Sequence, residues 1–357
     1  MSEPVNDGTN PSVPAKSDDR VRVSVLDLAP IVQGSDAGKA LANTIPLART
    51  AERLGFVRYW VAEHHNMQGI ASSATAVVIG HVAAATERIR VGSGGIMLPN
   101  HAPLVIAEQF GTLASLYPGR IDLGLGRAPG TDQQTAYALR RTLNSAVDSF
   151  PQDIRELQFF LGPRQENQKV HAIPGMNTNV PIWILGSSLY GAQVAAMYGL
   201  PFGFASHFAP AMMHEAITIY REKFRPSDQL DRPYVMLGYN VCAADSADEA
   251  NFLRTSGLQS FLRMRTGKPS RLPPPVKDFE VNLDPTSRNV LKTVRVASVV
   301  GDQQAVIEGM QTFVDDTQAD ELIVVCQIYD FQKRLRSYEI VAEAAQEVRR
   351  EYAIEAT

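Results

Sequence analysis

Short apolar segments alternate along this chain with longer segments in which apolar residues recur every three to four positions. The short segments are typical of strands that are covered on both faces, and the long ones of helices. Strands are expected at 22–28, 59–64, 89–98, 121–127, 181–188, 202–206, 234–243 and 321–329. Helices are expected at 38–54, 72–86, 103–116, 131–161 with a break at Pro151, 191–198, 210–224, 247–266, 303–317 and 331–352.

Eight strand–helix alternations in one chain predict an α/β protein built as a (β/α)8 TIM barrel with loop insertions. An open doubly wound sheet is the alternative. Two segments, 162–180 and 268–302, interrupt the alternation and are interpreted as the insertions. Residues 21–357 are therefore expected to form a single barrel domain. Residues 1–20 are polar and lack the apolar centre of a signal peptide, which predicts a disordered leader.

Composition narrows the class of protein. The 357 residues are 45% hydrophobic, and 34 Lys and Arg against 38 Asp and Glu give a net charge of −4. With no basic stripe, neither a nucleic acid nor an anionic membrane is an expected partner. The longest apolar run, 74–85, is too short to span a bilayer. Cys242 and Cys326 lie in predicted strands, so buried free thiols and a cytoplasmic location are the simplest interpretation.

Two consecutive strands end in glycine-rich loops, and in a βα-barrel the site lies at the carboxyl ends of the strands. The strand at 89–98 contains Gly94-Gly95, which indicates a bulge or a close backbone approach. The strand at 121–127 leads into Gly124-Leu-Gly-Arg-Ala-Pro-Gly130. This segment is no dinucleotide fingerprint, because Pro129 stands where the helix would start. Arg127 is as well suited to a phosphate or a ring oxygen as to a structural ion pair.

The strand at 181–188 ends in Gly186-Ser187-Ser188, and Tyr190 follows in the next helix. A helix N-terminus of this kind offers backbone N–H groups, hydroxyls and the positive end of the dipole to an anion. The same serines would also serve as ordinary helix caps. With Arg127 on the adjacent strand, phosphate binding is favoured.

The second strand ends in Glu63-His64-His65, a group that suits acid–base chemistry or a metal. Because neighbouring strand positions face opposite ways, the two imidazoles are not expected to face one ligand. His207 is the only other histidine at a comparable place after a strand. We therefore predict no metal, a functional role for His64 and a structural role for His65. A metal-dependent barrel hydrolase ranks last, and no Gly-x-Ser-x-Gly elbow supports a nucleophilic hydrolase.

From Val21 to Tyr352 the chain resembles the bacterial luciferase-like flavin monooxygenase family, and most closely the luciferase-family oxidoreductase group. The motifs that carry the resemblance are residues 60–65 (WVAEHH), 92–99 (GSGGIMLP), 118–127 (PGRIDLGLGR) and 184–188 (ILGSS). The family is a (β/α)8 barrel that binds reduced FMN or, in a related branch, the deazaflavin F420.

The resemblance also implies roles for individual residues. His64 falls on the active-site histidine beside the reactive edge of the flavin, and Gly94-Gly95 on a non-prolyl cis peptide under the ring. The positions that resemble cofactor-binding positions, or neighbour them at the phosphate, are Arg127, Gly186, Ser187, Ser188 and Tyr190. One departure is that luciferase has a flavin-site arginine near the position of Val105, so the phosphate contacts are expected to differ and luminescence is not implied.

The implied activity is a flavin-dependent monooxygenase. Reduced FMN from a separate flavin reductase would react with O2 to oxidise a small organic substrate such as an aldehyde, with His64 assisting proton transfer. The alternatives are an F420-dependent oxidoreductase and a non-catalytic flavin-binding protein. Because the family commonly dimerises, a homodimer is expected. The loops at 162–180 and 268–302 are expected to shape the substrate pocket.

Overall fold

The computed structural model describes residues 19–128, 133–139 and 149–350. It contains one parallel sheet of nine strands. Their bounds are β1 Arg22–Asp27, β2 Arg58–Val61, β3 Arg90–Met97, β4 Ile121–Gly126, β5 Ile182–Gly186, β6 Phe202–Phe204, β7 Val235–Ala243, β8 Ser298–Gly301 and β9 Glu321–Val325. Residues 1–18 of the predicted leader, and 131–132 and 140–148 of the predicted long helix, lie outside the described residues.

Eight of these strands close into a barrel. The order runs from β1 to β6, β6 pairs with β7, and β9 lies between β7 and β1. The long strand β7 pairs with β9 along Met236–Asn240 and with β8, outside the barrel, along Asn240–Ala243. The predicted (β/α)8 TIM barrel is confirmed.

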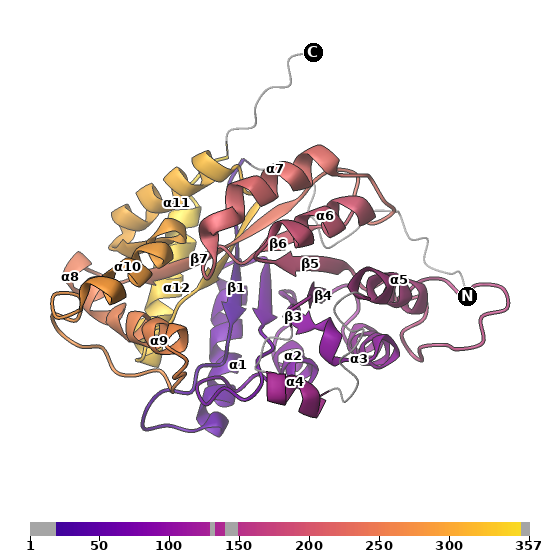
Figure 1. The fold of residues 1–357 in the computed structure, drawn as a ribbon, viewed down its shortest axis with the longest axis horizontal. Coiled ribbons are helices and arrows are strands. Elements are labelled where there is room, and N and C mark those ends of the chain that lie inside the picture. Colours follow the sequence, from indigo (N-terminus) through magenta and orange to yellow (C-terminus); the bar gives the residue numbers. More distant parts are fainter. Residues whose placement is uncertain (1–18, 129–132, 140–148, 351–357) are drawn as a thin grey trace, which may run out of the picture.

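Helices surround the barrel (Figure 1). Helix α1 shows how the sequence sets its limits. The Asp36 carboxylate accepts a hydrogen bond from the Lys39 N–H at 2.8 Å, and Gly55 takes a positive φ just after the end. The bounds are α1 Ala37–Arg53, α2 Thr75–Ala84, α3 Pro103–Leu116, α4 Gln133–Leu139, α5 Phe150–Leu161, α6 Leu189–Tyr198, α7 Met213–Lys223, α8 Ala247–Leu253, α9 Thr255–Arg265, α10 Pro285–Val294, α11 Gln303–Thr317 and α12 Phe331–Ala345.

The two predicted insertions differ in place and content. Residues 162–180 pack on the outer helix α3, because a Cβ on Gly111 would meet the Gly175 Cα at 2.1 Å. The prediction that this loop shapes a site at the strand ends is therefore wrong. Residues 268–302 are only partly loop, since they include α10 and β8. Within them, the Leu272 N–H donates to the Ile31 carbonyl after β1 at 3.0 Å, which places this stretch at the carboxyl ends of the strands.

The opposite end of the barrel holds a buried network of charges that the apolar pattern did not reveal. The fully buried Arg58 at the start of β2 donates to Glu321 at 2.7 and 3.0 Å and to Asp122 at 2.7 Å. Arg90 also binds Asp122, at 2.6 Å. Burial would raise the pKa of Asp122, but the two guanidinium groups outweigh it and the pKa is lowered. The amino ends of barrel strands are the usual place for stability rather than chemistry.

Both cysteines are buried free thiols, as predicted. Burial raises the pKa of Cys326 to about 11, so its reactive thiolate is scarce near neutral pH. No helix in the described part of the chain has the length and apolar character needed to cross a membrane.

Candidate active site at the carboxyl ends of the strands

The strand registers bring the predicted site residues to one end of the barrel. Val61 of β2 pairs with Ser93 of β3, so the segment after β2 runs beside Gly94-Gly95. Gly126 of β4 pairs with Leu185 of β5, so Arg127 lies next to Gly186 and the serines that follow. Strand β2 ends at Val61, three residues earlier than expected, and His64 therefore belongs to a loop.

The peptide bond between Gly94 and Gly95 is cis, as the family resemblance implied. The register between β3 and β4 shifts between Ser93 and Ile96, so the predicted bulge is present as well. Gly95 has no room for a side chain, and at Gly94 a side chain would displace Leu26. A Cβ on Gly94 would lie 2.5 Å from Leu26 Cδ1, and one on Gly95 would lie 2.7 Å from the Gly124 carbonyl oxygen. The backbone at this bend therefore carries no side chains and packs closely against Leu26 and Gly124.

Arg127 follows β4 and lies over the ring of Tyr190, with its guanidinium carbon 4.2 Å from the ring centroid. The arginine and the tyrosine are both half-buried. Among the residues that the structure describes, no carboxylate pairs with Arg127, so the structural ion pair considered for it is not found. A tyrosine face fixes the guanidinium and leaves its N–H donors available at the edge.

Helix α6 begins without a side-chain cap. Ser188 stands at the cap position in extended conformation, yet its hydroxyl accepts no hydrogen bond from the helix. Ser187 is exposed and makes no hydrogen bond within the described residues. The alternative that these serines are ordinary caps is therefore wrong. The first N–H groups of α6, two hydroxyls and Arg127 together form a suitable anion site.

His64 is half-buried in the loop after β2, and it lies within electrostatic range of His207, which follows β6. Burial, with a further contribution from His64, lowers the pKa of His207 to about 4, so His207 is neutral near pH 7. The His207 Nδ1 is buried without a hydrogen-bond partner and packs against Gly238, where a Cβ would meet it at 1.9 Å. Two imidazoles from opposite sides of the barrel thus approach each other at its mouth.

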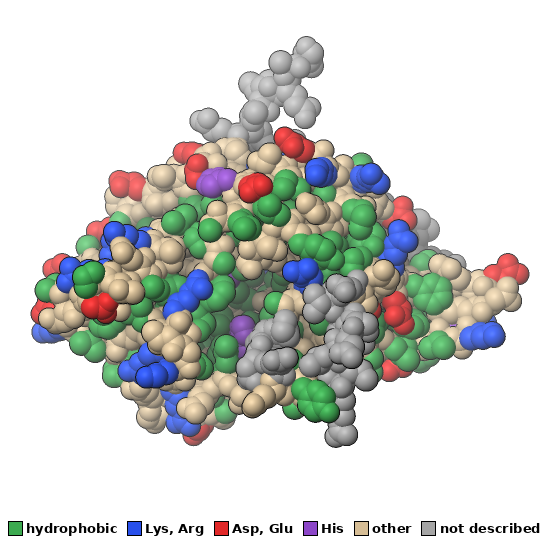
Figure 2. Space-filling view, viewed as in Figure 1, with side chains coloured by type: hydrophobic (Ala, Val, Ile, Leu, Met, Phe, Trp, Pro, Cys, Tyr) green, Lys and Arg blue, Asp and Glu red, His purple; other side chains and the backbone are tan. Residues whose placement is uncertain are grey.

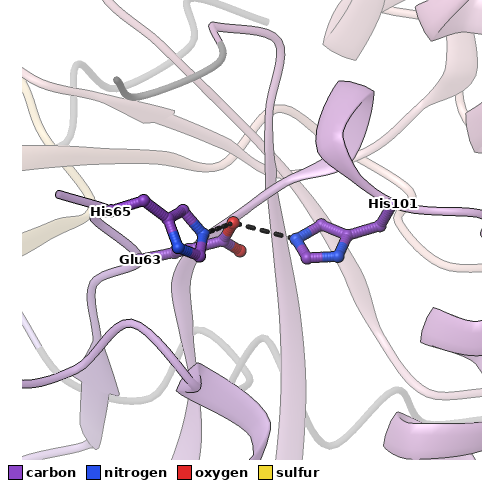
Figure 3. A group of neighbouring side chains, drawn as sticks. All are labelled: Glu63, His65 and His101. Carbon is purple, nitrogen blue, oxygen red and sulfur yellow. Dashed lines mark hydrogen bonds and ion pairs between the residues drawn. The ribbon is translucent and has the colours of Figure 1, made fainter. Parts of the chain in front are cut away.

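His65 contacts Glu63 within the loop after β2, where the strand alternation assumed for these residues does not apply. The Nε2 atoms of His65 and His101 each lie 2.8 Å from the same Glu63 oxygen, Oε1 (Figure 3). The other oxygen, Oε2, accepts the Met97 N–H at 3.1 Å. Burial acts to raise the pKa of Glu63, but His101, His65 and the Met97 N–H outweigh it and lower the pKa.

A hollow of about 440 Å³ adjoins this cluster. It is bounded by His65, Asn66 and four residues of α4: Gln134, Thr135, Ala138 and Leu139. In the space-filling view the middle of the molecule is hollowed, with hydrophobic side chains around it and an imidazole in its depth (Figure 2). The hollow is wide open to solvent.

Sequence reasoning missed His101 and the role of Glu63. His101 follows β3 after a short 3₁₀ helix, Leu98–Asn100, and so lies one strand away from Glu63. The usable signal was the presence of a carboxylate and histidines just after two adjacent strands.

Comparison with known proteins decides the family. A profile of the luciferase-like monooxygenases matches residues 21–320. The chain belongs to the luciferase-like monooxygenase family. It is 50% identical over 332 residues to a luciferase-like monooxygenase of Escherichia coli K12, covering 93% of this chain and 99% of that one. A Bacillus subtilis N-acetyl-S-alkylcysteine monooxygenase is 40% identical over 191 residues, 52% of this chain and 57% of that one.

Solved structures show the same family fold. Apo-MsnO8 is 35% identical, with a TM-score of 0.82 over 92% of this chain and all of that one. Two more distant structures are similar in fold alone. The oxygenating constituent of 3,6-diketocamphane monooxygenase in complex with FMN, from Pseudomonas putida, is 16% identical with a TM-score of 0.68, covering 93% and 100%. An F420-dependent secondary alcohol dehydrogenase is 15% identical with a TM-score of 0.66, covering 91% and 99%.

Proposed function

We propose that this protein is a flavin-dependent monooxygenase that uses reduced FMN and O2 to oxidise a small organic substrate. The observation that carries the proposal is the uncapped N-terminus of α6 beside Arg127. The helix terminus and the guanidinium offer hydrogen-bond donors to a phosphate, and no carboxylate among the described residues pairs with Arg127. FMN consists of a flat ring and a flexible chain that ends in a phosphate. The bare bend at Gly94-Gly95 suits the ring.

Some of the site residues would bind the cofactor and others would transfer protons. Arg127, Ser187, Ser188 and the first N–H groups of α6 would hold the phosphate, with Tyr190 keeping the guanidinium in place and Gly186 shaping the turn. When bound, the reduced flavin supplies electrons for the reaction with O2. His64 would hold or move a proton on its imidazole, and neutral His207 would leave the mouth of the barrel without a second positive charge.

A binding and turnover assay tests the proposal. Titration of the purified protein with FMN and with F420 should show preferential FMN binding. Oxygen consumption with reduced FMN should then rise when a suitable substrate is added. The substrate panel should combine aldehydes with S-alkyl thioethers, because one relative acts on N-acetyl-S-alkylcysteine. Preferential F420 binding, or FMN binding without substrate-dependent oxygen consumption across the panel, would overturn it.

Replacing Arg127 with glutamine is expected to weaken FMN binding by about 10- to 100-fold, the value of a hydrogen bond to a charged group. Binding of riboflavin, which lacks the phosphate, should change little. Arg155 offers a matched control, since its guanidinium lies 5.4 Å from the ring centroid of Tyr198, outside the proposed site. Fluorescence quenching of each flavin measures the affinities. Equal losses for FMN and riboflavin would place Arg127 at the ring instead of the phosphate.

The partners follow from the same proposal. A separate flavin reductase would supply reduced FMN. This is tested by adding a reductase with its nicotinamide substrate in place of prereduced flavin.

A second copy of the chain is expected to pack on α2 and α3, because the exposed residues of both helices include no Asp, Glu, Lys or Arg. Val77 and Leu116 on this face are 73% and 63% exposed. Val77→Asp should convert a dimer to a monomer in light-scattering measurements.

A further inference from the structure

Glu63 differs from the other deeply buried acids of the protein. Four carboxylates in the described ranges are at most 1% exposed: Asp27, Glu63, Asp122 and Glu321. Three of them pair with arginine. The side-chain partners of Glu63 are two imidazoles, His65 and His101. No arginine or lysine pairs with Glu63 among the described residues, so the cluster offers one carboxylate and two imidazoles to a cation.

The geometry of the cluster matches a set of metal ligands. The Nε2 atoms of His65 and His101 approach Oε1 of Glu63 from two sides (Figure 3), and all three atoms lie within 4.8 Å of one another. Donors around a tetrahedral zinc ion lie about 2.0–2.2 Å from the metal and so about 3.3 Å apart. Small side-chain rotations therefore suffice. The Met97 N–H already orients the carboxylate through Oε2, as supporting hydrogen bonds do in metal sites.

We propose that Glu63, His65 and His101 form a binding site for a divalent transition-metal ion, with zinc as the best match to two imidazoles and one carboxylate. The histidine side chains are 15% and 26% exposed, so the cluster is partly accessible from solvent. A zinc ion with three protein ligands would take water or a small ligand as its fourth. His65 also borders the hollow beside α4. The ion would tie the loop after β2 to the segment before α3. This site is independent of the FMN proposal.

The sequence favoured a metal-free role, and its argument concerned the wrong pair of histidines. The second imidazole of the cluster comes from His101, after the adjacent strand β3, and not from His64. The cluster is thus assembled by the pairing of β2 with β3 and by no local motif.

Zinc binding to the full-length protein tests the proposal. After treatment with EDTA and dialysis, calorimetric titration with zinc chloride should show one equivalent bound per chain. The unfolding midpoint should rise with zinc concentration, because the ion binds the folded state. Absence of a zinc-dependent signal in both measurements would overturn the proposal.

His101→Gln is the decisive variant. Glutamine keeps an N–H donor for Glu63 but is a poor zinc ligand, so folding should be retained while zinc affinity falls by about 100-fold or more, beyond the usual effect of a supporting residue. Glu63→Gln should behave alike, and if it does not fold, His101→Gln still decides. The control is His214→Gln, which removes an exposed imidazole 3.4 Å from Asp316 and should leave zinc binding unchanged. Equal zinc affinity in His101→Gln and the parent protein would overturn the site.

Discussion

Replacing Arg58 with methionine is expected to lower the free energy of unfolding by about 3–5 kcal/mol, because it leaves buried charge without its partner. Glu321 would lose both hydrogen bonds from the guanidinium and keep only hydroxyl donors such as Tyr234, at 2.9 Å. Asp122 would still have Arg90. The loss also includes the contact of Arg58 with the ring of Trp183, at 4.6 Å from its centroid. Urea denaturation followed by circular dichroism measures the change.

A surface pair provides the comparison for Arg58. Arg53 is 63% exposed and lies 3.7 Å from Glu339, so Arg53→Met should alter stability by no more than about 0.5 kcal/mol. Adding Glu321→Gln to Arg58→Met removes the stranded charge and should recover part of the loss. Glu321→Gln in the parent protein gives the cost of that substitution alone. If it lowers the free energy of unfolding of the Arg58→Met variant by the same amount, the unpaired charge of Glu321 does not cause the loss of stability.

The barrel could be predicted because its information is local and repeated. Strands covered on both faces give continuous apolar runs such as 322–325, and each run is followed by a helix with its own apolar face. The strand β8 was missed, since its four residues, Ser298–Gly301, pair only with the extended half of β7 outside the barrel. It lies within 268–302, the segment that was interpreted as an insertion because it interrupts the alternation.

The site residues that lie within one contiguous motif were predicted. Those that are brought together by the pairing of two strands were missed. The cis bond at Gly94-Gly95 and the turn at Ser187-Ser188 lie within contiguous motifs, so the resemblance located them. The grouping of Glu63 with His101 depends on the pairing of β2 with β3, which no single segment records. For the same reason, no single segment records the contacts of Arg58 with Glu321 and Asp122 at the opposite end of the barrel.

Replacing His64 with alanine is expected to lower substrate-dependent turnover by about 100-fold or more, the usual contribution of a positioned acid or base. FMN binding should be retained, because the proposed phosphate anchor lies after β4 and β5 and His64 lies after β2. His64→Gln, which keeps a hydrogen-bonding group without a titratable nitrogen, should lose as much turnover as the alanine variant. Oxygen consumption with reduced FMN and an accepted substrate measures turnover, and flavin fluorescence measures binding.

His207 determines how this result is interpreted. Burial is the larger cause of its lowered pKa and persists in the His64→Ala variant, so His207 is a poor substitute for a lost proton donor near pH 7. The His64→Ala variant should therefore stay slow across the neutral range, while His214→Gln at the exposed surface should leave turnover unchanged. Parent-like turnover in His64→Ala would show that proton transfer takes another route. Lost turnover together with lost FMN binding would instead make His64 part of the cofactor cradle.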